Sequence, residues 1–490
     1  ISQWGHDFRP DYRTFGQHLP ALRPAPVIAM TATATPIVQD DIAERLGLAA
    51  GGRFIQGFRR ENIAIEVVEA SPGERTRLVE QLLADDERRP AIVYAPTRKQ
   101  ADSLAVHLRA AMPCDSYHAG LGAAVRNRVQ EEFLAGRLEV IVATIAFGMG
   151  IDKPDVRTVI HTALPGSVEG YYQEVGRAGR DGLPSRAVLM HSYADRHTHN
   201  YFIERDYPPT AILQQIYSAL DAEPMPKEVL QGKLSMDEEV FDKALEKLWI
   251  HGGAVVDFAE NVARGEDAWR DPYEYQGAQK RAQLDRMIQF AETQRCRMQA
   301  LVAHFGDRDG AKLPCGLCDF CAPDQCETQV VREPHDDELR MARAVIAVLK
   351  GMDSPSSVCD YLGLKIAADR DLFEKLLASM AAAGWVEIRD ASFTADGREV
   401  RYRKVSLTRE GRGATEETDL GLVIRQRVER TQKTRAKRSK AAAKTGGKAA
   451  PGKAARGQAA TKAAAGAKKA LVEIEPEDFD EAAVGNPALE

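Results

Sequence analysis

Residues 143–152 read ATIAFGMGID and residues 171–182 read YYQEVGRAGRDG, and these two stretches decide the fold. The first follows the β-forming run Val140-Ile141-Val142. It is therefore predicted to be a buried strand that opens into a glycine-rich loop. The second stretch lies beyond a further strand and is predicted to be a helix.

The predicted helix is loosened at its end by Gly176 and Gly179. Arg177 and Arg180 are three residues apart, which on a helix places both guanidiniums on one face. Such a pair forms a fork suited to phosphate oxygens. A solvated surface is the usual place for charged residues, but the two glycines and Gln173 beside them favour a phosphate site.

Strands and helices alternate on both sides of the two stretches. This alternation predicts a parallel sheet with helices on both faces, an α/β fold in which ligands gather at the carboxyl ends of the strands. The predicted strands are residues 91–94, 115–118, 140–143, 158–161 and 187–191, and the predicted helices are residues 98–110, 125–134 and 168–175.

The two stretches resemble motifs V and VI of superfamily 2 helicases, and their sequences are most similar to those of the RecQ family of DNA helicases. Three further pieces resemble that family in the expected order. They are ISQWGHDFRPDY at residues 1–12 (its aromatic-rich loop), MTATA at residues 30–34 (motif III) and IVYAPTR at residues 92–98 (motif IV). The resemblance implies a RecA-like parallel-sheet helicase lobe preceded by part of a first lobe.

The resemblance also implies roles in ATP hydrolysis. Arg180 is expected to be the arginine finger and Arg177 a second phosphate contact, with Gln173 orienting groups around the phosphates. Positioned arginines stabilise the charge that spreads over the γ-phosphoryl oxygens, and such a finger contributes ~10³–10⁵ in rate. The residues expected to bind the nucleotide are Asp152, Gly150 and Gly176.

A second set of residues is expected to contact DNA. Spacing alone would pack Trp4 and Phe8 into a core, whereas the resemblance implies an exposed loop on which a base of single-stranded DNA stacks. Residues in the loops beyond the predicted strands would touch the phosphates of one DNA strand. The implied DNA contacts are Trp4, His6, Phe8, Arg9, Thr97, Arg98 and Thr144.

No Gly-x-x-x-x-Gly-Lys-Ser/Thr phosphate loop occurs in the sequence. In the RecQ family the acidic magnesium-binding residues stand immediately before the aromatic-rich loop, and this chain starts there, at Ile1. We therefore expect a fragment that lacks most of its first lobe and does not hydrolyse ATP alone. ATP with Mg²⁺ is the cofactor expected of the intact protein.

A cysteine cluster gives the strongest metal signal. The motif CxxCxxC at residues 315–321 follows a predicted helical stretch, residues 278–306, that carries Cys296. These spacings suit a tetrahedral site for a structural Zn²⁺, because free thiols rarely cluster so tightly. The pattern also matches the RecQ zinc-binding subdomain, with Cys326 as a spare. The predicted ligands are Cys296, Cys315, Cys318 and Cys321.

The stretch 337–410 resembles a winged helix, with three predicted helices and a two-stranded wing. Arg401 and Arg403 belong to a basic wing strand, which is expected to contact duplex DNA. The alternative is a solvated edge strand that its charges protect from pairing.

The net charge of −6 conceals an asymmetry. Residues 425–469 hold 15 Lys and Arg against one acid, whereas residues 470–490 hold seven acids and no base. The basic tail cannot bury a core and is expected to be disordered. It should bind DNA without sequence preference and with steep salt dependence. The acidic end is expected to fold back on this tail or to bind a partner.

Six segments are expected along the chain. No run of 18 apolar residues occurs, which excludes a membrane-spanning helix of the usual length. The segments are a remnant of lobe 1 (1–50), lobe 2 (51–205), a helical or winged-helix-like insert with packing as its default role (206–262), a helical zinc-binding subdomain (263–330), a winged-helix-like domain (335–411) and a disordered basic tail with an acidic end (412–490).

These features predict a RecQ-like ATP-dependent DNA helicase that translocates 3′ to 5′ and acts in DNA repair and recombination. Its expected partners are single-stranded DNA, duplex junctions and, as a candidate, a single-stranded-DNA-binding protein, in a bacterial cytoplasm at the nucleoid. A non-catalytic DNA-binding scaffold built from the zinc and winged-helix parts is the alternative. The zinc cysteines and the aromatic loop disfavour an RNA helicase.

Overall fold

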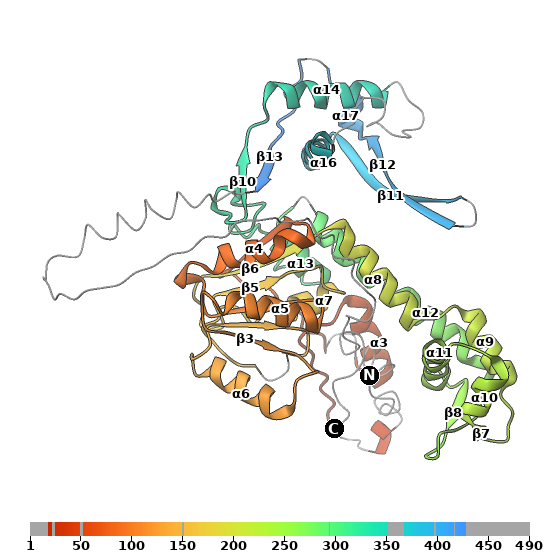
Figure 1. The fold of residues 1–490 in the computed structure, drawn as a ribbon. Helices are drawn as coiled ribbons and strands as arrows, with labels where there is room; N and C mark the ends of the chain where they lie inside the picture. Colours follow the sequence, from red (N-terminus) through yellow and green to blue (C-terminus); the bar gives the residue numbers. More distant parts are fainter. Residues whose placement is uncertain are drawn as a thin grey trace, which may run out of the picture.

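A parallel sheet of six strands, in the order β1-β6-β5-β2-β4-β3, forms the centre of the protein (Figure 1). The computed structural model describes residues 18–21, 25–49, 52–148, 151–293, 295–350, 367–395, 398–415 and 417–427. The strands are β1 (Ile63–Glu69), β2 (Ala91–Tyr94), β3 (Cys114–Tyr117), β4 (Val140–Ala143), β5 (Thr158–His161) and β6 (Ser185–His191). The sheet confirms the predicted α/β class, and β1 adds an edge strand ahead of the first predicted one.

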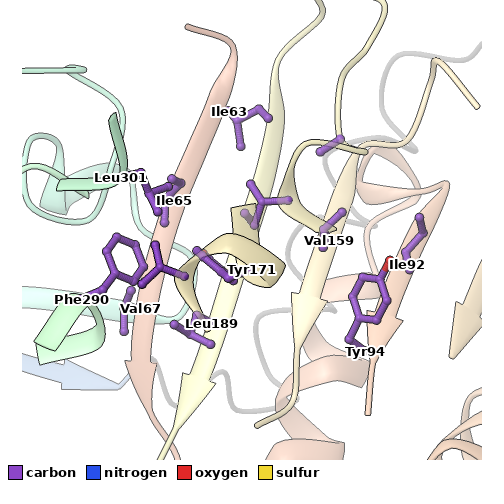
Figure 2. Close-up of a cluster of buried hydrophobic side chains, with 14 of the residues drawn as sticks. Ile63, Ile65, Val67, Ile92, Tyr94, Val159, Tyr171, Leu189, Phe290 and Leu301 are labelled. Atoms are coloured by element: carbon purple, nitrogen blue, oxygen red, sulfur yellow. The ribbon is translucent and has the colours of Figure 1, made fainter. Parts of the chain in front are cut away.

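Different helices bury the two faces of the sheet. Ile92 and Tyr94 point into a cluster that includes Tyr171 and Phe290, which Figure 2 shows packed beside the strands. Val93, between them, points into the opposite cluster. Because both faces are covered, the short inner strands are continuous apolar runs. The helices are α4 (Pro72–Leu83) and α5 (Arg98–Leu108) on the second face, and α6 (Ala123–Leu134) and α7 (Val168–Val175) on the first.

A helical arm leaves the sheet through α8 (Tyr193–Asp206) and returns through α12 (Arg270–Glu292) (Figure 1). The segment between them has its own core, which includes Phe241 and Trp269. It contains three helices, in keeping with the predicted helical insert, and an antiparallel sheet of three strands in the order β7-β9-β8. Its elements are α9 (Thr210–Ala219), β7 (Met225–Pro226), α10 (Lys227–Leu234), α11 (Glu238–Ile250), β8 (Ala254–Val256) and β9 (Asn261–Arg264).

The helix predicted over residues 278–306 is two helices, so that prediction was wrong. The first, α12, ends at Glu292, and α13 (Arg297–His304) starts after Cys296, which is its N-cap residue. The guanidinium of Arg297 donates to the carbonyl oxygens of Phe290 and Ala291 at 3.0 and 3.1 Å. The chain can therefore break here because a side chain satisfies the last carbonyls of α12.

A separate C-terminal unit packs around its own core (Figure 1). Residues 351–366 of the predicted winged helix lie outside the described residues, and the winged-helix identity stays a prediction. The unit joins the lobe through a two-stranded stem in which β10 pairs with β13. Its elements are β10 (Gln329–Arg332), α14 (Asp336–Lys350), α16 (Ala367–Ala382), β11 (Val386–Ala395), β12 (Arg398–Leu407), α17 (Arg409–Gly413) and β13 (Ile424–Arg427).

The folded chain continues past residue 412, where the tail was predicted to start. Leu420, Leu422 and Ile424 are buried in the core of the C-terminal unit. Residues 417–427 are therefore part of the folded unit, and the basic and acidic parts of the predicted tail beyond residue 427 lie outside the described residues. Among the described helices, none combines the length and the apolar content needed to cross a bilayer.

Candidate functional site

Arg177 and Arg180 lie in a turn after α7 and not on the helix itself. The helix ends at Val175 with Gly176 as its C-cap, so the prediction of one shared helix face was wrong. Residues 176–183 are called the arginine turn below. Gly179 adopts a positive φ of 54°, and a Cβ there would collide with neighbouring side chains. Only glycine suits this position.

Two side chains from the segment before β1 hold the arginine turn. Arg60 donates to three of its carbonyl oxygens, with distances of 2.9–3.0 Å. Asn62 donates to the carbonyl oxygens of Gly179 and Leu183 at 2.7 and 2.9 Å. These bonds, called the clamp below, fix the backbone of the turn. They do not involve the side chains of Arg177 and Arg180.

The guanidinium of Arg180 remains accessible. Its Nη1 lies 2.6 Å from Asp152 Oδ1, but the side chain of Arg180 is 36% exposed and that of Asp152 is 84% exposed. An ion pair this exposed contributes little to stability, because water competes for both charges. Arg180 can therefore exchange the carboxylate for a phosphate at small cost.

Arg177 lies deeper, against the glycine-rich loop. A Cβ on Gly148 would stand only 3.2 Å from its Nη2, so glycine lets the guanidinium approach the backbone. Tyr94, at the end of β2, donates its hydroxyl to the carbonyl oxygen of Phe147 at 3.0 Å. Burial raises the pKa of this hydroxyl, and the nearby Arg177 opposes that shift. The loop and Arg177 thus meet at the carboxyl edge of the sheet.

Gln173 faces the segment that resembles motif III. Its Nε2 donates to Thr33 Oγ1 at 2.6 Å, across an exposed contact. The sequence predicted a position near the phosphates, and the structure brings Gln173 to the MTATA segment. Gly176 is the helix cap described above, and Gly150 lies outside the described residues.

The predicted DNA contacts of the lobe differ in accessibility. Thr97 is 1% exposed and accepts a hydrogen bond from the backbone N–H of Gln100 as the N-cap of α5. Thr144 is 2% exposed. Arg98 is half-buried, and its Cδ packs over Gly120. Among these three candidates, Arg98 offers the most accessible polar group.

The remaining DNA candidates are placed only in part. Arg401 and Arg403 occupy alternate positions of β12, paired with Ser392 and Asp390 of β11. The residues of the aromatic-rich loop lie outside the described residues: Trp4, His6, Phe8 and Arg9.

All four predicted zinc ligands converge. Within the described part of the chain, the Sγ atoms of Cys296, Cys315, Cys318 and Cys321 lie within 4.8 Å of one another. This cluster is called the cysteine corner. Backbone N–H groups point at its sulfurs, for example that of Cys315 at Cys296 Sγ (3.2 Å) and that of Arg297 at Cys318 Sγ (3.4 Å).

Four thiols with backbone donors fit a structural Zn²⁺. The neighbouring thiols of Cys315 and Cys318 lower the pKa of the Cys296 thiol, and contact with Cys296 raises that of Cys315. A divalent cation favours the deprotonated form of all four, and four protein ligands leave no position open for a reacting water. Cys326, the spare candidate, is outside this group.

A buried ion pair ties the cysteine corner to the sheet. Arg297 and Asp319, the residues after Cys296 and Cys318, are 2% and 1% exposed and form two hydrogen bonds of 2.9 Å. The N–H of Asp319 donates to the carbonyl oxygen of Ile65 on β1 at 3.0 Å. The corner thus covers the edge strand of the sheet, where backbone groups would otherwise lack partners.

Four residues that hold the two sites were not predicted from the sequence: Arg60, Asn62, Arg297 and Asp319. The first two act over more than 100 residues of sequence separation, so local patterns carry no trace of them. Arg297 and Asp319 each directly follow a predicted ligand, and that adjacency was an available signal.

This combination defines a class of protein. A parallel-sheet lobe presents two arginines at its carboxyl edge, and a four-cysteine corner covers its edge strand. Residues 74–182 match the helicase conserved C-terminal domain, and residues 254–322 match the RecQ zinc-binding domain.

Curated proteins similar to this chain include several DNA helicases. The RecQ-like DNA helicase blm-1 of Caenorhabditis elegans is 44% identical over 40% of this chain and 20% of its own length. The ATP-dependent DNA helicase RecQ of Bacillus subtilis is 45% identical over 42% of this chain and 35% of its own length. Among solved structures, a DEAD box protein from Methanococcus jannaschii is 24% identical over 35% of this chain and 47% of its own, with a TM-score of 0.28. Over these residues the chain is similar to the RecQ family of superfamily 2 helicases.

Proposed function

We propose that this chain supplies the second motor lobe and the DNA-engaging parts of an ATP-dependent 3′–5′ DNA helicase that acts in DNA repair and recombination. The chain spans 20% and 35% of the lengths of the two relatives above, whose printed names describe DNA helicases. The observation that carries the proposal is the arginine turn, whose backbone is clamped while Arg180 stays exposed.

The chemistry of this turn suits phosphoryl transfer. Hydrolysis of ATP spreads negative charge over the γ-phosphoryl oxygens, and a preorganised cation stabilises that charge without reorganising in the transition state. Arg180 would leave Asp152 for the γ-phosphate, and Arg177 would form a second contact from the glycine-rich loop. ATP and Mg²⁺ would be held mainly by a phosphate loop, which the 490 residues do not contain.

The DNA would run past the carboxyl edge of the sheet toward the C-terminal unit. Arg98 would contact one strand, and Arg401 and Arg403 on the basic strand β12 would contact duplex. The basic segment at residues 425–469 would add affinity without sequence preference. We extend the proposal to single-stranded and junction DNA as substrates, to a single-stranded-DNA-binding protein as partner, and to a place at the nucleoid.

The test adds a phosphate loop from a relative. The first lobe of the Bacillus subtilis RecQ relative is fused ahead of Ile1, and ATP hydrolysis is measured with and without single-stranded DNA. We expect hydrolysis that DNA stimulates, and a loss of ~10³ in rate for Arg180→Ala. Arg137→Ala, an exposed arginine after α6, is the matched control and should hydrolyse ATP normally.

A fusion that binds DNA but hydrolyses ATP equally well with Arg180→Ala would contradict the motor assignment. The non-catalytic scaffold would then be the better description.

A further inference from the structure

One corner of the zinc module touches both the helix that directly follows the motif III segment and the helix before the arginine turn. The contact involves Phe305 and Gly306, which follow α13, and is separate from the cysteine ligands. Gln39, on α3 (Pro36–Leu46), donates from Nε2 to the carbonyl oxygen of Phe305 at 3.1 Å and to that of Ala34 at 2.7 Å. The carbonyl of Phe305 ends a helix and has no partner within it.

The backbone at this corner approaches α3 closely. Gly306 has a φ of +80°, and a Cβ there would lie 3.0 Å from Pro36 Cγ. Glycine thus serves both the left-handed conformation and the close approach. Pro36 opens α3, where a fixed φ suits the first helical turn. The start of α3 therefore rests directly on the zinc module.

The same corner packs on the helix that leads to the arginines. Phe305 is fully buried and stacks on Phe58, with ring centroids 4.7 Å apart and planes 6° apart. It also contacts Tyr172 of α7 at 4.9 Å, and the Tyr172 hydroxyl donates to the carbonyl oxygen of Phe58 at 2.8 Å. The next residue, Gln173, holds Thr33 of the motif III segment.

We propose that the Phe305–Gly306 corner is a latch that sets the motif III segment against α7, with Gln39 and Gly306 as positioning residues. The segment is held at two points: Thr33 on Gln173, and Gln39 with Pro36 on the latch. The Thr33 contact is exposed, and a single exposed hydrogen bond is too weak to fix a segment. The latch supplies the second point and makes the spacing between motif III and the arginine turn depend on the zinc module.

The first test uses the chain as it is and needs no ATP. Amide hydrogen exchange of residues 33–46 is compared among the natural protein, Gln39→Met and Gly306→Ala. Methionine keeps the length of the side chain and removes both N–H donors. Both variants should exchange about tenfold faster in this segment at unchanged zinc content. Gln130→Met on α6 is the matched control and should exchange normally, and an unchanged rate in both latch variants would overturn the latch.

The second test rests on the proposed function and asks whether holding the segment matters to the motor. In the fusion with the Bacillus subtilis lobe, Gln39→Met should lower the DNA-stimulated kcat about tenfold and leave the KM for ATP unchanged. A loss confined to KM, or an unchanged kcat, would overturn the positioning role. If the parent fusion itself is inactive, the proposed function fails, and the exchange measurement still decides whether the latch exists.

Discussion

The cysteine corner and the arginine turn use charge in opposite ways. In the corner, Arg297 and Asp319 are 2% and 1% exposed, and their charges are spent on each other and on backbone groups. In the turn, Arg180 is 36% exposed, and the side chains of Arg60 and Asn62 carry the structural work. The buried charges stabilise the fold directly. The exposed charge of Arg180 leaves that task to neighbouring side chains and stays accessible to a ligand.

Loss of a zinc ligand should have the largest effect on stability. Cys318→Ser removes a fully buried ligand, and zinc-linked folding free energy is on the order of 10 kcal/mol. We expect loss of zinc and unfolding of the module at temperatures where the natural protein is stable, measured by metal analysis and thermal melting. Cys326→Ser is the control, since this thiol lies outside the cluster. Equal zinc loss in both variants would contradict the ligand set.

Breaking the buried ion pair should cause the second-largest loss of stability. Asp319→Ala leaves the Arg297 charge buried without its partner, which costs about 3–5 kcal/mol of unfolding free energy. Denaturant titration measures this. Asp309→Ala, in the same module and 88% exposed, should leave the midpoint unchanged. A small effect of Asp319→Ala would mean that water reaches the pair.

Removing the clamp should have a smaller, local effect. Arg60→Ala deletes three hydrogen bonds from one charged donor, and a bond of that kind contributes about 1.5–3 kcal/mol. The three bonds share one half-buried guanidinium, and water can replace part of them in the variant, so their contributions do not add in full. We expect a loss of about 2–3 kcal/mol and faster amide exchange in residues 176–183. Arg77→Ala on α4, an exposed arginine in the same lobe, should change neither. An arginine turn that keeps its exchange rates without Arg60 would show that Asn62 alone suffices.

The smallest effect on stability should come from the residue expected to matter most to activity. Arg180→Ala breaks only an exposed ion pair, so its unfolding free energy should change by less than ~1 kcal/mol. Denaturant titration checks this against the ~10³ loss of rate expected above. A large destabilisation would place Arg180 among the structural charges and erase the contrast between the two regions.

Local chemistry made part of this structure predictable. The strands at residues 91–94, 140–143 and 158–161 have the bounds expected from the sequence, because strands buried on both faces are short apolar runs. The four ligands were equally visible, because three of them share one short motif. The break before Cys296 was missed because its cause, the Arg297 side chain on α12 carbonyls, is a tertiary contact.

Longer-range features could not be read from local patterns. Arg60 is 116 residues from the first carbonyl that it holds. The folded end of the C-terminal unit was missed because Leu420, Leu422 and Ile424 stand beside a low-complexity basic segment whose composition dominated the prediction.

The stem formed by β10 and β13 determines where the chain enters and leaves the C-terminal unit. Gln329 pairs with Arg427, and the residue before it, Thr328, donates from N and Oγ1 to the buried carboxylate of Glu66 on β1. The polypeptide therefore enters and leaves the outer unit at one joint. The residues that follow Arg427 therefore start beside the edge strand of the six-stranded sheet and not at the far end of the C-terminal unit.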